Sequence, residues 1–239
     1  MKAYDRTHRE TKKTSQAKSA PPPTPKINNF YFDPASFEKT VADDCEAAFR
    51  VYQQQYTGET FYAYGLMTQR AFEPLYPVAV TEEMLNRAVD SEMARDARRY
   101  EGMNRANIRW FLRHRHSSLV DGDDQNIRHD LSISHQFGFF GFIASAALVL
   151  PPAEVDHLQA EHSKSYIEAC LNALRSLDQK GVFGDESTRS KVTLFFTEHT
   201  IHALPVNGID VLNPPDIFTR YRIEKAKADS FDPYRRRSV

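Results

Sequence analysis

The chain is poor in the residues that build easily recognised active sites. It has nine glycines in 239 residues, and none of them forms the glycine-rich pattern of a loop that holds phosphate groups. The His-Glu-x-x-His motif of zinc hydrolases is missing, and no serine lies between the glycines of a nucleophile elbow. The sequence therefore predicts no catalytic residue and no cofactor, and an enzymatic role is not the favoured one.

Cysteine is equally scarce. Cys45 and Cys170 lie in unrelated segments, each among apolar and small neighbours at helical spacing. Two such residues do not make a disulfide scaffold, so we expect two buried free thiols in a reducing compartment. We therefore predict a cytoplasmic location.

Long apolar segments are also missing. The first 26 residues are polar and lack the apolar core of a secretory signal. The longest apolar run, residues 137–152, has about 14 residues before its prolines, which is too short for a membrane span. We predict a soluble protein with no membrane partner.

Charge is present, but it is unevenly distributed. Residues 1–27 carry seven basic and two acidic side chains, and residues 220–239 carry seven and three. Residues 28–219 carry seventeen basic against twenty-seven acidic side chains. An acidic body repels nucleic acid and attracts a protein with a basic surface, so nucleic acid is expected only at the tails.

The pattern of residues predicts one α+β domain over 30–228, between a disordered Pro/Ser/Lys-rich basic tail (1–29) and a basic C-terminal tail (229–239). Apolar residues at three- and four-residue spacing predict a helix from Pro34 and a long helix from Pro151 that stops at Gly181. ETFYAYGLMT (59–68), PLYPVAV (74–80) and KVTLFFTEHT (191–200) predict strands, the second at a sheet edge because of its prolines. Thr81 is the expected N-cap of another helix. The predicted sheet is mixed or antiparallel and flanked by helices.

Histidine pairs are the only hint of a metal site. His114 and His116 are two residues apart, and His199 and His202 are three apart, but neither pair has cysteines or carboxylates at a familiar ligand spacing. The loop DGDDQN (121–126) lacks the glycine and glutamate of an EF-hand. We therefore predict no metal.

The stretch IRWFLRHRHSS (108–118) allows two interpretations. Trp110 and Phe111 could stack on bases while the arginines bind phosphates. Alternatively, Ile108, Trp110 and Leu112 pack in the core, and Arg109, Arg113 and Arg115 pair with acidic side chains of the same chain. The acidic body favours the second interpretation, and Trp110→Ala should then cost the few kcal/mol that follow truncation of a buried aromatic.

Several segments together resemble a bacterial family of single α+β domains of unknown function, often encoded near contact-dependent or polymorphic toxin systems. The resembling segments span about 35–225 and comprise ETFYAYGLMT (59–68), TEEML (81–85), IRW (108–110), the long helix 152–180, KVTLFF (191–196) and LNP (212–214). The resemblance implies an immunity role, and it carries over no catalytic residues.

The function predicted first is therefore an immunity-type protein-binding module that neutralises a basic toxin through an acidic face. The acidic residues expected to contact the partner are Asp43, Asp44, Glu46, Asp121, Asp123 and Asp124. Two alternatives stay open. One is an uncharacterised hydrolase or metal- or ligand-binding enzyme built on His199, His202 and nearby carboxylates. The other is a nucleic-acid accessory protein that uses its basic tails.

Overall fold

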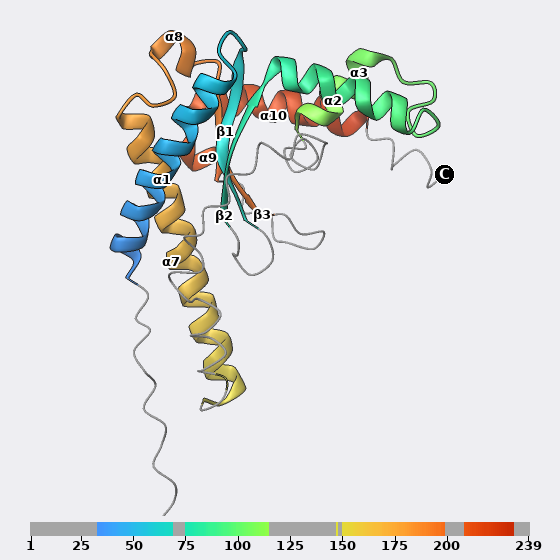
Figure 1. Ribbon diagram of the computed structural model, residues 1–239. Helices are drawn as coiled ribbons and strands as arrows, with labels where there is room; N and C mark the ends of the chain where they lie inside the picture. Colours follow the sequence, from blue (N-terminus) through green and yellow to red (C-terminus); the bar gives the residue numbers. More distant parts are fainter. Residues whose placement is uncertain (1–32, 69–74, 115–146, 148–149, 199–207, 232–239) are drawn as a thin grey trace, which may run out of the picture.

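A three-stranded sheet covered by helices on both faces forms the body of the protein (Figure 1). The computed structural model describes residues 33–68, 75–114, 147, 150–198 and 208–231. The strands are β1 (Phe61–Thr68), β2 (Leu75–Thr81) and β3 (Thr193–Glu198). Helices α1 (Pro34–Gln55) and α7 (Pro152–Gln179) pack on one face, and α2 (Glu82–Arg95), α3 (Arg105–Arg113) and α10 (Pro215–Ser230) pack on the other. The predicted α+β class with a mixed sheet is confirmed.

Strand β1 is the centre of the sheet. It pairs antiparallel with β2 and parallel with β3, in the order β2-β1-β3. Seven of its eight residues are buried, because helices cover both of its faces. Strand β2 lies at an edge, as its prolines predict, since Pro77 has no N–H to donate to a second neighbour.

Glycine is required at one position of the central strand. Gly65 lies opposite Phe195, and a Cβ at this position would come within 2.3 Å of the Phe195 carbonyl oxygen. The missing side chain therefore lets β3 pair closely with β1 while the Phe195 ring covers the gap.

Helices α1 and α7 close the first face with an apolar, strongly aromatic core. Phe37, Cys45, Phe49 and Tyr52 of α1 are fully buried, and the Phe37 ring lies 4.8 Å from that of Tyr166 on α7. Asp33 caps α1 by accepting a hydrogen bond from the Ala35 amide. The apolar residues at three- and four-residue spacing thus lie on one buried face of each helix.

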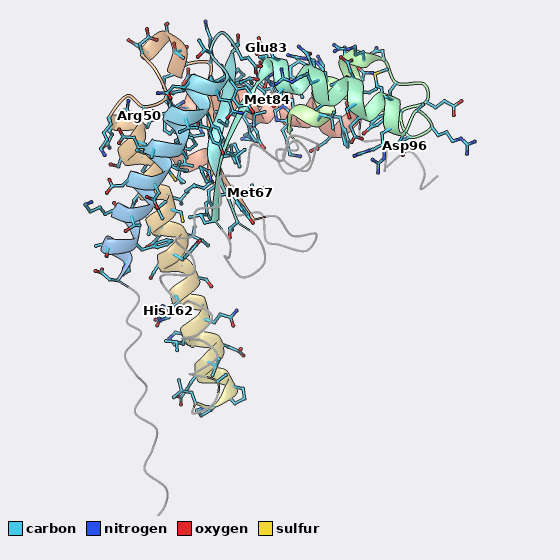
Figure 2. The ribbon with its side chains drawn as sticks, in the orientation of Figure 1. Arg50, Met67, Glu83, Met84, Asp96 and His162 are labelled. Carbon is cyan, nitrogen blue, oxygen red and sulfur yellow. The ribbon has the colours of Figure 1, made fainter. Side chains whose placement is uncertain are left out.

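Helix α7 extends beyond the end of α1 (Figures 1 and 2). None of residues 152–165 is buried, and His162 lies on this projecting part in Figure 2. The apolar Val155 and Leu158 of this part are only half-buried, whereas Tyr166, Cys170 and Leu177 further along α7 are buried. None of the described helices combines the length and the apolar character needed to cross a membrane.

The second layer starts directly after β2. Thr81 caps α2 by accepting a hydrogen bond from the Met84 amide, as predicted. Figure 2 shows Glu83 and Met84 beside the sheet and Asp96 at the far end of α2. Helix α3 packs against both α2 and α10, and this layer extends away from the sheet on the side opposite α7 (Figure 1).

A buried asparagine closes the free edge of β3. The Asn213 side chain accepts from the Leu194 amide (2.9 Å) and donates to the carbonyls of Leu194 (2.7 Å) and Ile209 (2.8 Å). Asn213 follows the short helix α9 (Ile209–Leu212). Arg189 of α8 (Glu186–Arg189) donates to the Asp178 carboxylate of α7 and to the Leu212 carbonyl of α9, so it links these two helices. The LNP segment therefore supplies the hydrogen bonds that a neighbouring strand would otherwise give.

Candidate functional site

The predicted partner-binding residues of the first helix lie on the outward side of α1. Asp43 and Asp44 are exposed, and Glu46 is partly exposed. Lys39 donates a 2.6 Å hydrogen bond to Asp43 and lowers the pKa of that carboxyl, and Arg50 does the same for Glu46 at 2.7 Å. Asp44 makes no hydrogen bond or ion pair with any described residue. Of the three acids, only Asp44 presents an uncompensated carboxylate.

The other three predicted partner-binding residues lie outside the described part of the chain. Asp121, Asp123 and Asp124 fall within 115–146, and so do His116 and Arg115. His199 and His202 of the alternative enzymatic site fall within 199–207. Whether the DGDDQN loop joins the α1 acids on one surface stays a prediction.

The basic-aromatic stretch begins as helix α3, and its helical period decides which side chains are buried. Asn104 caps the helix by accepting from the Asn107 amide. Ile108, Phe111 and Leu112 are buried, whereas Trp110 is only partly buried. The expectation that Trp110 packs in the core with Ile108 and Leu112 is wrong. Residues 108 and 112 share a helix face, and residue 110 lies about 200° around the axis from 108.

Two of the three arginines that were predicted to pair within the chain, Arg109 and Arg113, do so, and Arg115 lies outside the described residues. Arg109 and Arg113 both donate to the carboxylate of Glu82 in the first turn of α2, Arg113 at 2.5 Å. The guanidinium of Arg113 also lies over the Tyr62 ring, 4.1 Å from its centroid. Because these charges are compensated, the described part of the stretch is not a free phosphate-binding surface.

His114, at the end of α3, is the most unusual side chain of the described residues. Its side chain is 4% exposed, and neither Nδ1 nor Nε2 has a hydrogen-bond partner in the part of the chain that the structure describes. Its ring stacks on Trp110 at an interplanar angle of 4° and meets Tyr221 of α10 edge-on, 5.1 Å between centroids. The nearest carboxylate oxygen of Glu224 is 3.7 Å from Nε2, too far for a hydrogen bond.

The surroundings keep this imidazole neutral. Burial, with added repulsion from the charges of Arg113 and Lys225, lowers the pKa of His114 to about 4. Nearby, the Tyr62 hydroxyl is also buried without a partner, and burial raises its pKa. A neutral imidazole offers one acceptor and one donor, and a neutral phenol offers a donor, so these two side chains hold unused hydrogen-bonding capacity.

The side chains around His114 come from four elements, and we call them the His114 cluster. They are Tyr62 of β1, Glu82 of α2, Arg113 and His114 at the end of α3, and Tyr221 and Glu224 of α10. Because these elements are distant along the chain, the sequence could not reveal the cluster. Tyr62, Tyr221 and Glu224 lie far from His114 along the chain, and none belongs to a motif. The one sequence signal was the histidine and tryptophan four residues apart, at the spacing that stacks two side chains on a helix.

Metal and thiol chemistry find no support among the described residues. No group of three or more His, Cys, Asp or Glu side chains that could hold a metal ion occurs within them. Cys45 and Cys170 are buried free cysteines, as predicted, and burial raises the pKa of both thiols. Both thiols are therefore poor nucleophiles.

The fold and the site thus define an α+β protein with an acidic outer helix and a buried, neutral histidine–tyrosine cluster. Within it, residues 42–114 match the model of a protein family described as a domain of unknown function (DUF4303). The matched segment runs from α1 through α3 and ends at His114. No curated protein matches the chain, and no solved structure matches it either.

Proposed function

We propose that the protein is an immunity-type binding module that neutralises a basic toxin through the outward face of α1. The observation that carries the proposal is the charge of this face. On this face Asp43 and Asp44 are exposed and Glu46 is partly exposed, and of these three acids only Asp44 lacks a partner among the described residues. The resemblance to families encoded near polymorphic toxin systems supports the same role.

The buried side of α1 makes this face available for binding. Every buried residue of the helix is apolar or tyrosine, and the core needs nothing from the acids on the opposite side. Exposed charges of one sign accelerate association with an oppositely charged partner more than they lengthen the life of the complex. We therefore expect the acids to act on the association rate, and to act less at high salt.

The test measures association with the toxin encoded by the neighbouring gene in a stopped-flow instrument at low salt. Asp44→Lys should slow association by about tenfold, the scale of electrostatic steering. Asp43→Asn should have a smaller effect, because Lys39 already compensates Asp43. Glu101→Lys, an exposed acid outside α1 without an ion pair among the described residues, is the matched control and should leave the rate unchanged.

Two results would contradict the proposal. The first is that the purified neighbouring gene product does not bind at low salt. The second is that Asp44→Lys and Glu101→Lys slow association equally, which would mean that only the net charge of the protein matters. The nucleic-acid alternative depends on tails of which the structure describes only residues 229–231, at the end of α10. It predicts salt-dependent binding that disappears when 1–29 and 229–239 are removed.

We propose a ligand-binding or enzymatic role as the second candidate, and the unpaired His114 and Tyr62 support it. A panel of ester, amide and phosphate-ester substrates is the appropriate screen. An activity that is lost in His114→Gln but kept in His157→Gln, which changes an exposed histidine of α7, would favour this role. An activity that survives His114→Gln would place the chemistry elsewhere.

A further inference from the structure

A cavity of about 310 Å³ lies away from both regions described above, where the end of α1, the start of β1 and the α7–α8 connection meet. Its size is at the lower end of the range for small-molecule sites. None of the α1 acids and no member of the His114 cluster lines it. Its function is therefore a separate question from partner binding.

Aromatic side chains form one part of the cavity wall. Phe61 and Tyr64 stack at 5.0 Å between centroids with an interplanar angle of 20°, and Phe183 lies 5.1 Å from Tyr64. Tyr64 and Phe183 are nearly fully buried, so their positions are fixed by the core, while Phe61 is partly exposed. A rigid aromatic wall favours a flat apolar group in the ligand.

Gln53 and Tyr64 supply two of the polar groups of the cavity wall. The Gln53 amide group donates to the Tyr64 hydroxyl oxygen (3.3 Å) and to the Val182 carbonyl (2.9 Å). The Tyr64 hydroxyl is thus an acceptor in this pair, and its own proton has no acceptor among the described residues. Burial raises the pKa of Tyr64 to about 12, so the hydroxyl keeps that proton at neutral pH.

The charges at the cavity do not cancel. Glu59 lines the cavity, but its carboxylate already accepts hydrogen bonds from Arg87 (2.9 Å) and from Thr81. Lys191 also lines the cavity, and it makes no ion pair with a described residue. The Thr188 hydroxyl adds another donor. The Lys191 ammonium and the Thr188 hydroxyl can therefore still bind an anionic group of a ligand.

We propose that this cavity binds a small planar carboxylate, with its ring against Phe61 and its carboxylate facing Lys191 and the Tyr64 hydroxyl. The connection between α7 and α8, which forms part of the cavity wall, needs glycine at position 184. Gly184 has a φ of +106°, and a Cβ there would lie 2.7 Å from the Thr188 side chain. A side chain at this position would therefore strain the backbone and displace Thr188 from the cavity wall.

The experiment titrates the full chain with sodium benzoate and, separately, with benzamide, and follows the backbone amides by NMR. Benzoate should cause saturable shifts at amides of residues 53–64 and 183–191. Benzamide has the same ring without the charge, and it should bind about tenfold more weakly, the scale of one charge-assisted hydrogen bond.

Two lysine variants separate this site from a general attraction of anions. Lys191→Met should weaken benzoate binding about tenfold and leave benzamide binding unchanged. Lys180→Met, which removes an exposed lysine outside the cavity, should change neither. Tyr64→Phe keeps the ring and removes the hydroxyl, and it should weaken benzoate binding less than Lys191→Met does.

The proposal is overturned if benzoate causes no saturable shifts at these amides, if benzamide binds equally well, or if Lys191→Met and Lys180→Met weaken binding equally. None of these results bears on the α1 face, because Asp44→Lys leaves every residue of the cavity in place.

Discussion

The two faces of the sheet differ in how they treat buried polar groups. On the α1/α7 face, the Tyr52 hydroxyl donates to the Pro77 carbonyl, and Tyr64 accepts from Gln53. On the α2/α3/α10 face, the Tyr62 hydroxyl and both nitrogens of His114 have no partner. Within the described residues, these three are the buried side-chain polar atoms without a hydrogen bond, and all of them lie on one face.

This difference predicts that the two faces contribute unequally to the free energy of unfolding. Leaving a buried polar group unpaired costs about 1–3 kcal/mol. Among the described residues, the α1/α7 face has no buried side-chain polar atom without a hydrogen bond, whereas the α2/α3/α10 face gives up stability at Tyr62 and His114. We therefore expect the α1/α7 face to contribute more to the free energy of unfolding.

The largest expected effect is on the α1/α7 face. Phe49 is fully buried and its ring contacts those of Tyr52, Tyr64 and Phe183. Phe49→Ala should lower the free energy of unfolding by about 3–5 kcal/mol, measured by urea denaturation. Phe49→Leu is the control and should cost less. A loss below about 1 kcal/mol for the alanine variant would show that this face is not the stable half.

The next effect belongs to His114 and depends on pH. Its pKa is about 4 in the folded protein and near 6.5 when unfolded, so below pH 6.5 the unfolded chain binds a proton that the native state refuses. Stability should therefore fall by about 3 kcal/mol between pH 6.5 and 4.

The variant His114→Phe should remove this fall and raise the free energy of unfolding at pH 7 by about 1 kcal/mol. His157→Gln, at an exposed position, should behave as the native protein. If His114→Phe destabilises the protein at pH 7, the imidazole is satisfied in solution and the contrast between the faces disappears.

A smaller loss is expected for a buried polar group that is fully satisfied. Asn213→Ala leaves the amide and carbonyl of Leu194 without partners, so it should cost about 2 kcal/mol. Asn172→Ala, at an exposed position of α7, is the control and should cost much less. Equal stability of the Asn213 variant and the native protein would show that the edge of β3 is satisfied without this side chain.

The smallest effect is expected at Trp110. Its indole is partly exposed, stacks on His114 and lies 4.7 Å from the Lys227 ammonium. Trp110→Ala should cost about 1 kcal/mol, the scale of an exposed cation–π contact, not the several kcal/mol of a core aromatic. Combining it with Lys227→Met should add little, because both variants remove the same contact. A loss as large as that of Phe49→Ala would restore Trp110 to the core.

Much of the fold could be predicted, because its signals are local. The spacing of Phe37, Val41 and Cys45 predicted the buried stripe of α1, and the prolines of β2 predicted an edge strand. The cap at Thr81 needed only the neighbouring residues. The error at Trp110 is also local in origin: residues two apart were expected to share a face, which holds on a strand but not on a helix.

Little of the site could be predicted, because its geometry is not local. The pairing of Asp43 is the exception, because Lys39 lies four residues before it and the two side chains meet on one helix face. His114 was noticed as one of a pair with His116, but the residues around it come from β1 and α10. The cavity at Lys191 combines segments from α1, β1 and α8 that share no motif.

The sequence by itself determined which helices and strands form, which side of each is apolar, and where helices begin, because these depend on residues within a few positions of one another. Only the tertiary structure decided which polar groups find partners. A hydrogen bond or an ion pair requires two groups to lie within about 4 Å, and segments distant in the chain meet at that range only after the sheet and its two helical layers have packed.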